Sequence, residues 1–328
     1  MSEHRSTNVR FAIALPLIHA ALMSVLLLLF TWPAATAEPR NVPIGLVGPA
    51  KMTEAIAETI DSQRPGAFSI EFFDTASEAT SAIESKEIYG AIEVGAQTRT
   101  YVATAGNSGV SQLVNELGSA INESMLASQG ISIPILEKIE LAPLPDEDPR
   151  GQVLGSAALP FVVAGISLGA LTALRGGNRW SQISIVAAGA VITGLSLAYI
   201  LTQGIAVLPG EIWINALAIS SVIGAVSTTL LGAHRLTGMA GLGTMAATFF
   251  LLGNPLSGVS IPAEFYVEGW GVFGQSLPLG AGFELIKRIN FFELAETSPQ
   301  WWVLASWMVF GLSLWGLSFL RRATTIDI

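Results

Sequence analysis

Few residues of this 328-residue chain have types and spacing that suit catalysis. The three histidines are His4, His19 and His234, and none belongs to an HExxH zinc motif. The absence of cysteine excludes disulfides, thiol nucleophiles and thiolate metal sites. GLVGPAKMT at residues 45–53 has the glycines and lysine of a phosphate loop but lacks its GK[ST] ending. We therefore predict a chain that is not an enzyme and binds no metal or cofactor of its own.

Polar residues within 253–300 offer better candidates. This stretch stays apolar and aromatic, although prolines and glycines interrupt it. Broken backbone at membrane depth is tolerated only where protein or a water-filled cavity satisfies its polar groups. We therefore predict a re-entrant or interfacial hairpin that serves as a gate. Its candidate gate or substrate-pathway residues are Asn254, Pro255, Ser257, Gly258, Pro262, Glu264, Gln275, Pro278, Glu284 and Arg288.

Several of these candidates also have a purely structural interpretation. Asn254 and Ser257 either contact a substrate or cap a broken helix, and the Asn-Pro and Ser-Gly pairs favour capping. Glu264 and Glu268 share one face if the segment is helical. They then either line a vestibule that attracts cations or keep an interfacial helix in contact with water.

Spacing and composition add two expectations for the end of this region. Glu284 precedes Arg288 by four residues, which is the spacing of a helical ion pair. Aromatic residues are enriched at membrane interfaces. We predict an aromatic belt at the outer interface made of Trp270, Phe273, Phe283, Phe291, Phe292, Trp301 and Trp302.

Composition and hydropathy indicate an integral membrane protein. The chain is 51% hydrophobic and 12% charged, with a mean hydropathy of +0.56. A spanning helix needs about 20 apolar residues. The uncharged segments that we expect to span cover residues 11–32, 153–174, 180–203, 212–233, 236–252 and 301–320.

The first segment has a second interpretation as a cleaved signal peptide. Basic residues precede it, and Ala-Thr-Ala at 35–37 resembles a cleavage site, but its length favours an uncleaved helix. His19 lies inside this segment. Its imidazole either handles protons or stays neutral and bonds across a helix interface.

The basic residues outside the acidic segment predict the orientation. The positive-inside rule places short basic connectors in the cytoplasm. With six helices, both termini are then inside, and residues 38–150 and 253–300 are outside. The basic residues that fall on the inner side are Arg5, Arg10, Arg175, Arg179, Arg235, Arg321 and Arg322.

Residues 38–150 differ in composition and predict a small α/β domain inserted between the first two helices. They contain 17 acidic and 7 basic residues, against 8 and 9 in the remainder, so nothing here indicates nucleic-acid binding. A proline-rich acidic linker follows at 141–150. Apolar patterning predicts strands at 42–47, 68–73, 89–94 and 100–105, and helices at 51–63, 77–86 and 110–128. The organisation we expect is 1–37, 38–150, 151–252, 253–300 and 301–328.

This pattern resembles the ABC-2 type permeases, especially the actinobacterial branch related to the YhgE/phage-infection-protein group. The architecture covers almost the whole chain, whereas the motifs cover its last quarter. The most specific match is GNPLSG at 253–258. It is followed by Pro262, Gly274-Gln275, Leu277-Pro278, Gly280-Ala281 and Phe291-Phe292.

The resemblance implies a dimeric export permease in the bacterial plasma membrane, paired with itself or with a similar permease. ATP is then hydrolysed by a separate ABC ATPase. Its contact falls on residues 1–10 and on the loop from Arg175 to Arg179. Both are unusually short here, which speaks against conventional coupling. The charge-free helices suit a hydrophobic or amphipathic substrate.

The alternative is an envelope scaffold or receptor that binds partners through its external domain.

Gly165 and Gly169 form a GxxxG pair suited to close helix contact, within the chain or across a dimer.

Overall fold

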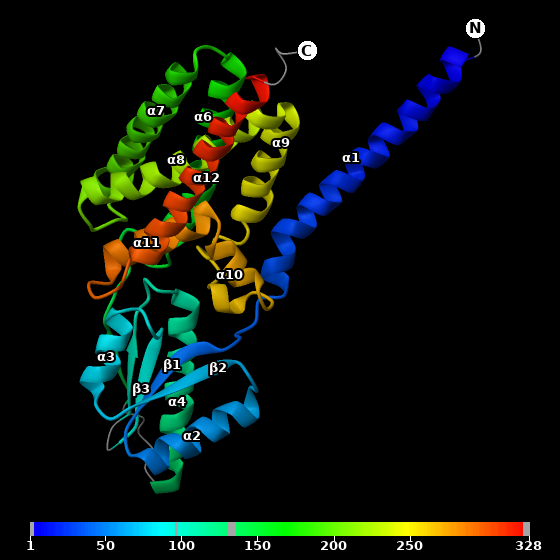
Figure 1. Cartoon of the computed structure of the whole chain (residues 1–328). Coiled ribbons are helices and arrows are strands. Elements are labelled where there is room, and N and C mark those ends of the chain that lie inside the picture. Colours follow the sequence, from blue (N-terminus) through cyan, green and yellow to red (C-terminus); the bar gives the residue numbers. More distant parts are fainter. Residues whose placement is uncertain (1–2, 96–97, 130–135, 324–328) are drawn as a thin grey trace.

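The computed structural model describes residues 3–95, 98–129 and 136–323, with side chains described from residue 14 to residue 320 apart from 96–97 and 128–135. A bundle of long helices occupies one end of the molecule and an α/β domain the other (Figure 1). Helix α1 (Glu3–Ala35) extends away from both.

The α/β domain has a five-stranded mixed sheet in the order β2-β1-β3-β4-β5. All neighbouring strands are parallel except β3 and β4, which form an antiparallel pair. The strands are β1 (Val42–Val47), β2 (Phe68–Phe73), β3 (Gly90–Glu93), β4 (Thr98–Val102) and β5 (Leu136–Glu140). The helices are α2 (Ala50–Gln63), α3 (Ala76–Glu84) and α4 (Ser108–Gln129).

Alternation along the strands produces two apolar cores, one on each face of the sheet. Val42, Ile44 and Leu46 of β1 point to one face, where side chains of α2 and α4 cover them. Val47 points to the other face, against α3. Phe292, which lies far along the chain, joins this second core and is 5% exposed. The helix bundle therefore contributes a side chain to the interior of the α/β domain.

The helical end of the molecule is organised around α8 (Ile212–Thr237), which packs against α6, α7, α9, α11 and α12. The other apolar elements of the bundle are α5 (Gln152–Ser156), α6 (Ala158–Arg175), α7 (Arg179–Tyr199), the π-helix η1 (Ile200–Gly204), α9 (Met239–Ala247), the π-helix η2 (Thr248–Gly253) and α12 (Ser298–Ala323). Between η2 and α12 lie the 3₁₀-helix η3 (Ala263–Phe265), α10 (Trp270–Gln275) and α11 (Pro278–Phe291).

Within the described residues, five helices are long and apolar enough to cross a membrane. They cover Ala14–Ala35, Gln152–Arg175, Arg179–Gly204, Ile212–Thr237 and Ser298–Leu320. The sixth expected span, 236–252, is the exception. Helix α8 continues to Thr237, and Gly238 (φ +71°) turns the chain so that the apolar helix Met239–Gly253 is shorter than a spanning helix.

The GxxxG pair packs within the chain. A Cβ on Gly165 would lie 2.6 Å from the Val226 Cβ, and one on Gly169 would lie 2.9 Å from the Ser227 Cα. Both neighbours belong to α8, so the missing side chains let α6 approach that helix closely. This pair is therefore used inside one molecule and offers no support for a dimer interface.

Helix α1 contacts the remaining structure near its C-terminal end. Phe30 lies 5.8 Å from Phe250, and Trp32 lies 6.1 Å from Trp270, measured between ring centroids. No residue of its most apolar 18-residue stretch is buried. His19 is exposed on this helix, so within the described part of the molecule it does not bond across a helix interface, and its proton-handling role stays a prediction.

The predicted aromatic belt is wrong for two of its members. Phe283 is 1% exposed and stacks on Phe161 at 5.1 Å in the bundle core, and Phe292 lies in the domain core. Trp302 and Phe273 are exposed as expected, at 72% and 40%. An aromatic-rich sequence cannot by itself distinguish interface residues from core residues.

Candidate functional site

Helix α11 lies between the bundle and the α/β domain and holds the candidate site. Its residues 278–283 and 285–287 are buried. Pro278 occupies the first turn, where a missing N–H costs nothing. A Cβ on Gly282 would lie 2.1 Å from Val222 of α8, so glycine is needed for this close contact. The region 253–300 is thus an irregular segment followed by two helices, packed between two parts of the protein.

Charged groups meet where α11 contacts the domain; we call Lys86, Tyr89, Glu264, Glu284, Lys287 and Arg288 the seam cluster. Lys86 donates hydrogen bonds to both carboxylate oxygens of Glu284. Arg288 Nε donates to Glu284 Oε1 at 2.7 Å, so the ion pair expected from the i,i+4 spacing is present. Burial alone would raise the pKa of Glu284, but the charges of Lys86 and Arg288 hold it at about 2.

Lys287 has an unusual environment for a charged side chain. It is 7% exposed, and its ammonium donates to the carbonyl oxygens of Gly106 (3.4 Å), Gly258 (3.4 Å) and Val259 (3.2 Å). Burial and repulsion from Lys86 lower the pKa of Lys287 to about 8. The residue ties the domain loop at Gly106 to the irregular segment after η2.

Tyr89 completes the seam cluster from the domain side. Its hydroxyl donates to Glu264 Oε2 at 2.8 Å. Burial, with the nearby charge of Glu264, raises the pKa of Tyr89 well above its ordinary value, so it stays a neutral donor. A cavity of about 240 Å³, which we call the seam cavity, opens between these groups. Pro262, Gln275 and Gln300 also line it.

The GNPLSG segment is held by residues that follow it. Tyr266 donates its hydroxyl to the Pro255 carbonyl (2.9 Å), and Gln275 donates to the Ser257 carbonyl (3.2 Å). Gly258 adopts φ +75°, which favours glycine. Ser257 donates to the Asn254 carbonyl at 2.9 Å, so these residues form a local turn. The motif residues converge on a packed turn against α10 and α11.

The other predicted site residues lie elsewhere. Glu264 is in η3 and Glu268 is exposed in a following turn, so the two do not share the face of one helix. Arg175 and Arg179 border a short exposed loop at the end of the bundle far from the α/β domain (Figure 1). Arg179 stacks on Phe319 at 4.0 Å, and Arg235 Nε donates to Gln182 at 2.8 Å at this same end.

One more stretch of the sequence matches a catalytic motif, that of a serine nucleophile. GISLG at 165–169 fits the GxSxG pattern of a serine nucleophile. That nucleophile requires a sharp turn between a strand and a helix. Ser167 instead lies in the middle of α6 and donates to the Ala164 carbonyl at 3.1 Å. The match therefore carries no catalytic meaning.

Sequence analysis did not identify Lys86 or Tyr89 as site residues. Their partners lie 198 and 175 positions away, so no local spacing could reveal them. Lys86 also has a positive φ of 59° just after α3, a backbone conformation that its sequence does not announce.

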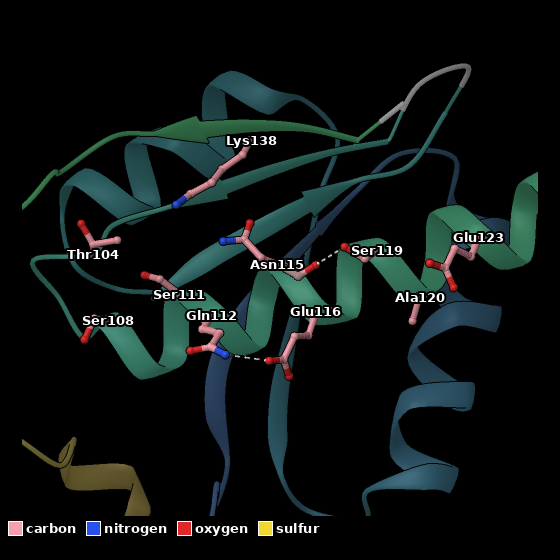
Figure 2. Close-up of a pocket in the computed structure, with 10 residues that line it drawn as sticks. All are labelled: Thr104, Ser108, Ser111, Gln112, Asn115, Glu116, Ser119, Ala120, Glu123 and Lys138. Atoms are coloured by element: carbon pink, nitrogen blue, oxygen red, sulfur yellow. Dashed lines mark hydrogen bonds between the residues drawn. The ribbon is translucent and has the colours of Figure 1, made fainter. Parts of the chain in front are cut away.

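Two more cavities adjoin the loop from Thr104 to Ser108. The larger, about 560 Å³, lies between α4 and the β4–β5 edge (Figure 2). Gln112 and Glu116 bond to each other there at 3.0 Å. This groove mixes Glu116 and Glu123 with Lys138, a combination that selects no single class of ligand. The smaller cavity, about 330 Å³, shares Gly106 and Lys287 with the seam cavity.

Comparisons with family models, with curated proteins and with solved structures find no match for this chain.

Acid is expected to weaken the seam. The low pKa of Glu284 contributes stability that is complete above its ordinary value of 4.5 and is lost as the pH falls toward 2. The loss amounts to about 3 kcal/mol. Thermal unfolding of the full chain between pH 6 and pH 3 captures about 2 kcal/mol of it, since pH 3 is still above the folded pKa. Because other carboxylates also titrate, the test is the comparison with Glu284→Gln, whose stability should depend less on pH; equal dependence would contradict the prediction.

Proposed function

We propose that this chain is the permease subunit of an ABC-2-like transporter that exports a hydrophobic or amphipathic compound and is energised by a separate ATPase. The observation that carries the proposal is the discontinuous apolar element Met239–Gly253. It ends in a π-helix and continues into the half-buried GNPLSG turn. Short, interrupted apolar helices that meet irregular backbone near a cavity are typical of transport pathways.

Charge at the two ends of the bundle supports an orientation. Arg175, Arg179 and Arg235 lie at the end far from the α/β domain. The positive-inside rule assigns that end to the cytoplasm of a bacterial plasma membrane. The α/β domain and the seam cluster are then extracytoplasmic.

The contacts of α11 suggest how the gate works. Phe283 is anchored in the bundle core and Phe292 in the domain core. A tilt of α8 or α6 would therefore move the domain and the GNPLSG turn together. In this proposal, Gln275 and Pro278 maintain the closed turn, while Asn254, Pro255, Ser257, Gly258, Pro262 and Glu264 form its wall.

An envelope scaffold or receptor is the second candidate. It is favoured by the connector between α6 and α7, which spans only residues 176–178. A surface this small is poor for coupling to an ATPase. The α/β domain also presents the open groove of Figure 2 to a partner.

Mild-detergent purification of the tagged full chain separates the two candidates. We expect a permease to recover a nucleotide-binding subunit and vanadate-sensitive ATP hydrolysis. Arg175→Glu, an exposed change at the cytoplasmic end, should lower the recovered ATPase at least tenfold. Arg64→Glu, which is exposed in the α/β domain, should leave it unchanged. Recovery of envelope partners without ATPase, under conditions that preserve a known ABC complex, would instead favour the scaffold.

A further inference from the structure

The 330 Å³ cavity differs from its neighbours in charge; we call it the anion pocket. Arg150 and Lys287 line it, whereas none of the described carboxylates does. The seam cavity, by contrast, contains Glu87, Glu264 and Glu284, and the groove on α4 contains Glu116 and Glu123. Its volume falls within the range of small-molecule sites, roughly 300–1,000 Å³.

Two carboxylates lie close behind the lining of the pocket, and each accepts from the backbone N–H of a residue that lines it. Asp148 accepts from the Leu154 N–H at 3.0 Å, and Glu140 accepts from the Thr104 N–H at 2.7 Å. Neither lines the cavity. The described lining itself therefore supplies positive charge and no negative charge.

The environment of Lys287 is a second observation that favours an anionic ligand. Buried ammonium groups normally have an anionic partner, because neutral acceptors compensate their desolvation incompletely. Among the described residues, the hydrogen-bond acceptors of Lys287 are three backbone carbonyls, and the charges of Glu284 and Glu264 act on it only from beyond ion-pair distance. An anion in this cavity would give the ammonium the direct contact that neither glutamate makes.

Helix α4 adds donors at the same place. This 22-residue helix begins at Ser108, which lines the pocket with Asn107. Asn107 Oδ1 caps the Val110 N–H at 3.1 Å, which leaves its amide nitrogen free to donate. A helix N-terminus carries partial positive charge and binds phosphate readily. The hydroxyls of Ser108 and Ser260 complete a lining of donors.

The position of the pocket indicates the kind of molecule that carries the anion. Gln152 and Leu154, which also line it, belong to the first turns of the span Gln152–Arg175. The end of a spanning helix lies at the depth of lipid headgroups. This depth favours a phosphate that is attached to acyl chains.

We propose that the anion pocket binds a phosphate group, with Arg150, Lys287 and the α4 N-terminus as its ligands. The site is independent of the transport proposal, since an exporter or a scaffold can equally hold a phosphate-bearing amphiphile. Within the permease interpretation, the pocket would lie beside the GNPLSG turn, because Val259 and Ser260 line it.

The test is thermal unfolding of the full chain in a neutral maltoside detergent. The added probes are phosphatidylglycerol, diacylglycerol with the same acyl chains and no phosphate, and inorganic phosphate. We expect phosphatidylglycerol to raise the melting temperature more than diacylglycerol does. A comparable rise with millimolar inorganic phosphate would assign the site to soluble phosphates, and no such rise would assign it to a lipid headgroup.

Ser108→Asp is the decisive variant because it separates folding from binding. A carboxylate in the first turn favours the helix dipole but repels phosphate. The variant should therefore fold normally and bind phosphatidylglycerol at least tenfold more weakly, as should Arg150→Gln. Arg64→Gln, exposed on α2's C-terminal side, is the matched control. Unchanged phosphatidylglycerol binding in both pocket variants, or an equal response to diacylglycerol, would overturn the proposal.

Discussion

Glu284→Gln is expected to lower the free energy of unfolding by about 3 kcal/mol and to release the α/β domain from the bundle. The wild-type carboxylate bonds to Lys86 and Arg288, whose side chains are 8% and 19% exposed. Glutamine keeps the shape but removes the negative charge. Two largely buried cations then face each other without compensation, and undocking the domain hydrates both.

The measurement is thermal unfolding in detergent together with limited proteolysis of the connections at 36–41 and 141–150. Undocking should expose these segments to protease before the bundle unfolds. Glu293→Gln, an exposed change two positions after α11, is the control and should behave like wild type. Adding Lys86→Met to Glu284→Gln should recover part of the loss, because it removes one unpaired cation. Equal stability of Glu284→Gln and Glu293→Gln would show that the seam does not depend on this carboxylate.

Much of the fold could be predicted from the sequence where local pattern decides structure. Strands β1 and β2 match the predicted ranges because apolar residues are dense there. Strand β5 (LEKIE) was not predicted, since its charges resemble a loop and its pairing with β4 at the sheet edge is a tertiary feature. Hydropathy located the long helices but placed the end of α8 at 233 rather than Thr237, because the uncharged segment stops before His234 and Arg235, which α8 includes in its last turn.

The site was predictable only in part, for a related reason. The pairing of Glu284 with Arg288 follows from helical spacing, and it is present. The roles of Lys86 and Tyr89 depend on the docking of two distant segments, which no periodicity encodes. The packing of GNPLSG likewise depends on Tyr266 and Gln275, which come later in the chain.

The two ends of α11 make the bundle and the domain mechanically continuous. Asn290 extends this link, because its amide nitrogen donates to the side-chain oxygen of Asn215 in α8 at 2.7 Å, while that residue's amide donates back at 3.0 Å. Asn215 is fully buried, so the reciprocal pair is protected from water. A displacement of α8 therefore reaches the α/β domain through side chains rather than through a flexible linker.

Gly311→Ala is expected to destabilise the bundle by about 2–3 kcal/mol, although alanine favours helix formation by about 1 kcal/mol over glycine. A Cβ at this position would lie 2.5 Å from the backbone of Thr228 and Thr229 in α8. Backbone atoms cannot rotate away as a side chain can, so α12 would have to move outward. That shift would also break the Thr229 hydroxyl bond to the Trp307 carbonyl (3.2 Å).

The same helix supplies the control for this prediction. A Cβ on Gly316 of α12 would have no heavy atom of the described residues within 4 Å, so Gly316→Ala should be neutral or stabilising. Thermal unfolding of both variants in detergent, with the monodispersity of each on size exclusion, measures the contrast. Helix propensity would move both melting temperatures upward, whereas close packing moves only that of Gly311→Ala downward. Equal shifts of the two melting temperatures would mean that a Cβ fits between α8 and α12 at position 311. The stability of the bundle would then not depend on close backbone contact there.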